Sequence, residues 1–121
     1  MDDLWPSNIA ETKLVSPVSI LKEQAALLGE KTKQLVQGEV KSQANDTLLV
    51  HSFFLVAPTL NYRYELFRVS HSMAFYPLNV MYLNRGTQVH SEAELKEKLK
   101  EIFAAQHTVN TVQSILATVQ P

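Results

Sequence analysis

Residues 48–57 read LLVHSFFLVA, and this stretch decides the fold. Alternate residues of a β-strand point to opposite sides of a sheet, so Val50 and Phe54 lie on one face and Phe53 and Leu55 on the other. Both faces are apolar, and a strand of this kind needs cover on both sides. Either helices cover both faces, or helices cover one face and a second subunit covers the other. The second arrangement is favoured, because homodimers are common and the stretch offers little polar surface to water.

The segments around this strand predict an antiparallel meander. Residues 40–44 alternate between apolar and polar, as an edge strand does, and Asn45-Asp46 predicts a tight turn. A turn at 58–61 leads to a strand over 62–71, and a further strand over 76–83 is closed by Asn84-Arg85-Gly86. The sheet therefore has about four strands. Within 62–71 the apolar side changes at two adjacent apolar residues, which indicates either a β-bulge or two buried faces.

Helical spacing brackets the predicted sheet. Ser16 and Pro17 begin a helix whose apolar stripe continues to Leu35, and this helix is expected to end near Gly38. Ser91 begins a second helix, and the chain bends near residues 107–108 before a third. The predicted class is α+β: an N-terminal helix, an antiparallel β-meander of about four strands, and two C-terminal helices packed on the sheet.

Composition limits the classes of protein that fit. The 121 residues are 45% hydrophobic, with 11 Lys and Arg against 12 Asp and Glu, three glycines and no cysteine. This favours one domain over 16–121 behind an N-terminal arm over 1–15. We expect a cytoplasmic protein that binds neither membranes nor nucleic acid, because the apolar runs are short and the net charge is −1.

The residues that usually carry chemistry do not form a recognisable catalytic or metal-binding pattern. The four histidines lack metal-ligand spacing, and the glycines are too far apart for a phosphate-binding loop. No nucleophile motif and no pair of acids can be assembled. The sequence therefore predicts no metal, no cofactor and no catalytic residue, and favours a non-enzymatic protein.

Tyrosine and arginine gather in the predicted sheet. All four tyrosines and all three arginines lie between residues 62 and 85. Tyr and Arg dominate the energetics of protein interfaces, so a sheet face is the expected surface for a homodimer or a protein partner. The expected interaction residues are Tyr62, Tyr64, Arg68, Tyr82 and Arg85. The leading hypothesis is a small interaction or regulatory protein acting as a homodimer.

Two other functions stay open at this stage. One is a small-molecule binder or enzyme with a pocket between sheet and helices, for which His51 and His71 are the candidate pocket residues, with Tyr64 and Arg68 nearby. The other is nucleic-acid binding through stacked tyrosines, which the residues favour least because the local surplus of positive charge is small.

Overall fold

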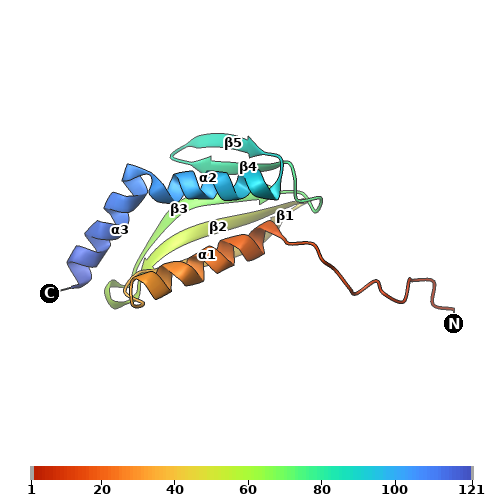
Figure 1. The fold of residues 1–121 in the computed structure, drawn as a ribbon, viewed down its shortest axis with the longest axis horizontal. Helices are drawn as coiled ribbons and strands as arrows, with labels where there is room; N and C mark the ends of the chain where they lie inside the picture. The colour runs from red at the N-terminus through yellow and green to blue at the C-terminus, as the bar shows by residue number, and fades with distance from the viewer. Residues whose placement is uncertain (1, 121) are drawn as a thin grey trace.

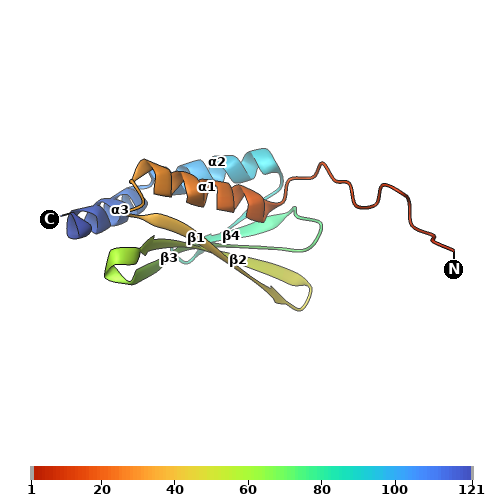
Figure 2. The ribbon, with the colours of Figure 1, turned by 90° about the horizontal axis from the view of Figure 1, so that it is seen from below.

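The computed structural model describes residues 2–120 and places three helices over one face of a five-stranded antiparallel sheet (Figures 1 and 2). The helices are α1 (Pro17–Lys31), α2 (Glu92–Ala104) and α3 (Gln106–Val119). The strands are β1 (Gln37–Asn45), β2 (Leu48–Ala57), β3 (Tyr62–His71), β4 (Leu78–Tyr82) and β5 (Arg85–Val89), in that order across the sheet, and the 3-10 turn η1 (Pro58–Leu60) joins β2 to β3. The predicted α+β class and the order of helix, meander and two helices are confirmed. Residue 1 of the predicted arm and residue 121 of the predicted domain lie outside the described residues.

The sheet has one strand more than the sequence predicts. The chain turns at Leu83 and Asn84, which have φ of 50° and 63°, and Arg85 already pairs with Tyr82. A two-residue turn with both φ values positive joins adjacent strands of a tight hairpin. The predicted turn over residues 84–86 is therefore wrong by about one residue, and β5 was missed because only Val89 in it is buried.

Helix α1 ends at Lys31, earlier than the predicted end near Gly38. The Thr32 hydroxyl donates to the Leu28 carbonyl oxygen at 3.0 Å and accepts from the Val36 amide at 3.1 Å, which holds a turn after the last helical residue. Leu35 and Val36 continue the helical spacing, but they belong to this loop. Gly38 lies in β1 against α1, where an added Cβ would be 2.5 Å from the Ala25 Cα.

A β-bulge explains the change of apolar side within β3. Phe53 pairs with Phe67 and Phe54 pairs with Glu65, so Leu66 is an extra residue in the ladder. Tyr64 and Phe67 consequently face the same side of the sheet although they are three residues apart. Of the two predicted explanations for this segment, the bulge is the one observed.

The core lies between the helices and one face of the sheet. On β2 the odd-numbered residues 51–57 are buried and the even-numbered residues 50–56 are half-buried. The largest fully buried side chains include Phe53, Leu55, Phe67, Val69 and Val80 from the strands and Leu21, Leu95 and Ile102 from the helices. Figure 2 shows that all three helices lie on this side, so no helix of residues 2–120 covers the other side of the sheet.

Candidate functional site

The uncovered side of the sheet, which we call the open face, carries an apolar row along its centre. The row consists of Val50, Phe54 and Val56 on β2, which are half-buried. Met81 on β4 is 41% exposed on the same face and is separated from β2 by Arg68 on β3. The register places Glu39 and Arg63 on either side of this row, since Glu39 pairs with Phe54 and Arg63 with Val56. The open face is thus the apolar face of β2 that the sequence predicts to need a second cover.

One ion pair crosses the apolar row from β1 to β3, and a second lies beside it on β3. Arg63 forms an ion pair with Glu39, and its guanidinium carbon lies 4.9 Å from the centre of the Phe54 ring. Arg68 Nη2 lies 2.8 Å from Glu65 Oε1. Exposed pairs of this kind add little to stability. They do leave the open face with both signs of charge next to its apolar centre.

The structure divides the predicted interaction residues between the two sides of the sheet. Tyr64 pairs with Leu55, and Tyr62 with Ala57, so both tyrosines are on the helical side. Tyr82 and its cross-strand neighbour Arg85 are also on the helical side. Arg68 pairs with Ser52 and Met81 and lies on the open face. The five residues therefore do not form one surface. The bulge in β3 places Arg68 on the opposite face from Tyr64, although an even spacing in a regular strand would put both on one face.

Two of the tyrosines hold the start of α3. Tyr64 Oη lies 2.8 Å from His107 Nε2, and Tyr82 Oη lies 3.0 Å from the Oγ1 of buried Thr108. Helix α3 follows α2 after the single residue Ala105 and begins without a side-chain cap. The hydrogen bonds from the sheet fix the position of this helix end. Tyr64 and Tyr82 therefore have a structural role. Tyr62, on the same side of the sheet, is 41% exposed beside α3.

His51 and His71, the predicted pocket residues, meet in the core. Each is 3% exposed, and their Nε2 atoms are 2.8 Å apart. His51 Nδ1 lies 2.6 Å from the Oγ of exposed Ser42, and His71 Nδ1 lies 2.7 Å from the Ser72 carbonyl oxygen. The structure brings the two histidines together, but neither lines any of the cavities described below.

The end of this chain of hydrogen bonds fixes its direction. The Ser72 carbonyl can only accept, so in the arrangement with two neutral rings His71 donates from Nδ1 and accepts at Nε2. His51 then donates from Nε2 and accepts at Nδ1 from the Ser42 hydroxyl. Each ring nitrogen is satisfied with both imidazoles neutral.

A serine, a histidine and an orienting third group also resemble a nucleophilic constellation. However, burial lowers the pKa of His51 to about 4, with smaller effects from the charges of His71 and Lys22. A base this weak removes a serine proton poorly at neutral pH. The chain of hydrogen bonds is better explained as the way this core satisfies two buried imidazoles.

An apolar groove lies between α1 and α3 and has the sheet as its floor. Its volume is about 390 Å³, within the range of ~300–1,000 Å³ typical of ligand pockets. Leu27, Leu28, Val112 and Leu116 form its helical walls, and Phe53, Leu55 and Leu66 lie beneath. Its polar lining residues are Gln24, Lys31, Thr108 and Gln113. Helical spacing in the sequence indicates which sides of α1 and α3 are apolar, but it does not indicate that the two helices leave a gap between them.

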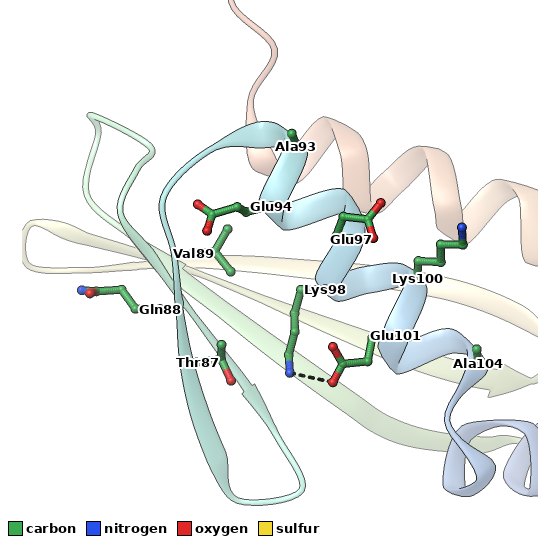
Figure 3. Close-up of a pocket in the computed structure, with 10 residues that line it drawn as sticks. All are labelled: Thr87, Gln88, Val89, Ala93, Glu94, Glu97, Lys98, Lys100, Glu101 and Ala104. Atoms are coloured by element: carbon green, nitrogen blue, oxygen red, sulfur yellow. Dashed lines mark hydrogen bonds and ion pairs between the residues drawn. The ribbon is translucent and has the colours of Figure 1, made fainter.

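A second cleft, of about 600 Å³, lies between β5 and α2 (Figure 3). Figure 3 shows Lys98 and Glu101 joined by an ion pair, at 3.3 Å, while Lys100 points away from β5. Glu94 accepts a hydrogen bond from the His90 amide at 2.9 Å, as part of the start of α2. These charged groups have local partners or point into solvent, so they do not converge on a common ligand position.

Within residues 2–120, no cluster of three or more His, Asp or Glu side chains could hold a metal ion. No helix in that range is long and apolar enough to cross a membrane. No family model, curated protein or solved structure matches this chain. The candidate sites therefore rest on the geometry of the chain itself.

Proposed function

We propose that this protein is a non-enzymatic interaction protein that works as a homodimer, with the open faces of two copies packed together. The observation that carries the proposal is the apolar row of Val50, Phe54 and Val56, with Met81 on the same face, on the side of the sheet that no helix of residues 2–120 covers. A second sheet stacked on this face, about 10 Å away, would remove the row from water.

The size of the open face fits a dimer. The strands contain 9, 10, 10, 5 and 5 residues. With a rise of ~3.3 Å per residue and a strand spacing of ~4.8 Å, the face measures about 600 Å² per copy. Two copies would bury about 1,200 Å², at the lower end of the size of specific interfaces.

The charges of the open face suit a second copy as the partner. A two-fold axis places the same surface on both sides of the interface, so each copy must offer both signs of charge. Glu39 and Glu65 provide acids, and Arg63 and Arg68 provide bases on the same face. Rotation about an axis near Phe54 can set acids of one copy against bases of the other.

Sedimentation equilibrium of three chains tests this proposal. The wild type should be a dimer, and Phe54→Glu should be a monomer because the charge would be buried at the centre of the interface. Ser114→Glu is the matched control, since it adds the same charge to an exposed position on α3, away from the open face, and should remain dimeric. A monomeric wild type, or a Phe54→Glu chain that dimerises as the wild type does, would rule out the open face.

The groove supports a second candidate, a binder of small apolar molecules between sheet and helices. The observation that favours this candidate is the cavity whose walls are Leu27, Leu28, Val112 and Leu116. An apolar fluorescent dye should bind there with saturation, and Val112→Asp should abolish that binding. Dye binding that Val112→Asp leaves unchanged would exclude the groove as the site.

A further inference from the structure

The N-terminal arm, residues 2–15, carries apolar side chains that are exposed within the described part of the chain. Leu4 is 90% exposed, Trp5 72%, Ile9 61% and Leu14 77%. The arm leads away from the rest of the molecule beyond the N-terminal end of α1 (Figures 1 and 2). An indole is a large apolar surface that proteins use as an anchor in interfaces. The arm therefore has the composition of a segment that docks on another surface.

The groove between α1 and α3 is an apolar surface large enough to receive such a segment. Leu27 at its edge is 37% exposed, and Leu28, Val112 and Leu116 are only partly buried. We infer that the arm of one copy lies in the groove of a second copy, with Trp5 inserted between α1 and α3. A cavity of about 390 Å³ is large enough for an indole and a neighbouring aliphatic side chain.

The charges of the arm and the groove are complementary. The arm contains Asp2, Asp3 and Glu11 against the single base Lys13. The groove is lined by Lys31 and by no acidic residue. Asp3 accepts a hydrogen bond from the Trp5 backbone amide at 3.1 Å, which holds its carboxylate next to the Trp5 backbone. Docking of Trp5 would bring this carboxylate to the rim that carries Lys31.

The backbone at the start of α1 directs the arm away from its own groove. Ser16 precedes Pro17, which holds Ser16 extended, and its φ and ψ are −76° and 151°. The Ser16 hydroxyl also accepts from the Ser19 amide at 3.2 Å, which ties this geometry to the helix start. The chain therefore enters α1 from the side on which the arm leads away from the rest of the molecule (Figures 1 and 2).

The arm is long enough to reach a neighbour. Trp5 precedes Ser16 by eleven positions, so an extended arm carries the indole about 36 Å from the start of α1. Helix α1 itself is only ~22 Å long. Two copies that exchange arms bury two identical contacts, and a two-fold axis closes the assembly. The exchange goes beyond the open-face dimer and does not require it.

Cross-linking of two chains that carry one thiol each tests the exchange. The chain has no cysteine, so introduced thiols are the only ones present. A Ser7→Cys chain is mixed with a Gln113→Cys chain of different length, and the disulfide-linked mixed pair is measured on a gel. Gln88→Cys replaces Gln113→Cys in the control, because position 88 lies on the open face of the sheet. We expect the arm–groove pair to link and the control pair to link far less.

The substitution Trp5→Ala tests whether the cross-link depends on the indole. It lies in the exposed arm and leaves the core untouched. The yield of the mixed disulfide should fall on the order of 30-fold, the loss expected for removal of an interface hot spot. A mixed pair that forms no faster than the control, or that is insensitive to Trp5→Ala, would overturn the inference. A Ser7→Cys, Gln113→Cys double variant that closes within one diluted chain would overturn the assignment to a second copy.

Trp5 is the only tryptophan, so its fluorescence reports docking directly. Its emission should shift to shorter wavelength as the wild type is concentrated, and Val112→Asp should remove the shift. Ser114→Asp is the matched control, because Ser114 is exposed on α3 and does not line the groove.

The two proposals fail in different ways. A chain without residues 2–15 should bind the apolar dye more tightly than the full chain and should keep the open-face dimer in sedimentation. If the dye binds equally well with and without residues 2–15, the arm does not occupy the groove, and this conclusion holds whether or not the open-face dimer forms.

Discussion

Replacing His51 with glutamine should flatten the pH dependence of the free energy of unfolding between pH 7.5 and 5. His51 is 3% exposed, and its burial lowers its pKa from 6.5 to about 4. The groups around it are Ser42 on β1, His71 on β3 and the charge of Lys22 on α1. The folded protein therefore keeps this imidazole neutral at a pH where the unfolded chain protonates it.

The sign and size of the effect follow from proton linkage. Below pH 6.5 the unfolded state binds more protons at His51 than the folded state, so stability falls as the pH falls toward 4. The stability that neutral His51 contributes is fully present above pH 6.5, the pKa of this residue in the unfolded chain. With pKa values of 6.5 and about 4, the change from pH 7.5 to 5 is about 2 kcal/mol. The wild type should therefore lose about 2 kcal/mol more stability than His51→Gln between pH 7.5 and pH 5.

Urea unfolding at the two pH values, followed by circular dichroism, measures this difference. His90→Gln is the control, because His90 is exposed and its loss should leave the pH dependence as in the wild type. If His51→Gln loses as much stability between pH 7.5 and 5 as the wild type does, His51 is not held neutral by the fold and the reasoning is refuted.

Three further substitutions test the packing in the same unfolding assay. Gly38→Ala should destabilise the protein by ~1–3 kcal/mol, because the new methyl group would lie 2.5 Å from the Ala25 Cα; a neutral result would show that α1 moves freely over β1. Tyr76→Phe should stabilise it by about 1 kcal/mol, since the Tyr76 hydroxyl is buried without a partner among the described residues and burial raises its pKa; a loss of stability would reveal a hidden partner. Ser91→Ala should lower the stability by about 1 kcal/mol, because the Ser91 hydroxyl accepts from the Glu94 amide at 3.2 Å; no change would mean that α2 does not depend on its cap.

The sequence predicts the strands and helices best where one physical signal acts alone. The alternating apolar faces of β2 and the serine caps of α1 and α2 correspond to the observed elements. The end of α1 was missed because Leu35 and Val36 keep helical spacing by chance. The hydroxyl of Thr32 stops the helix, and such a local hydrogen bond competes with helix formation without changing the apolar pattern.

The candidate sites were harder to predict because they depend on tertiary register. Tyr64 and Arg68 are four residues apart, and an even spacing would place them on one face of a regular strand. The extra residue Leu66 puts them on opposite faces. The contact between His51 and His71 likewise depends on which residues of β2 and β3 pair. Neither local propensity nor composition contains that information.

The same bulge marks where β3 can change in length during evolution. Removal of Leu66 would leave Phe53 paired with Phe67 and Phe54 with Glu65 in an uninterrupted ladder. A one-residue deletion at another position of β3 would turn one part of the strand over and expose its buried side chains. Related chains should therefore show insertions and deletions in this strand at position 66, at the expense of one buried leucine and of no other side chain.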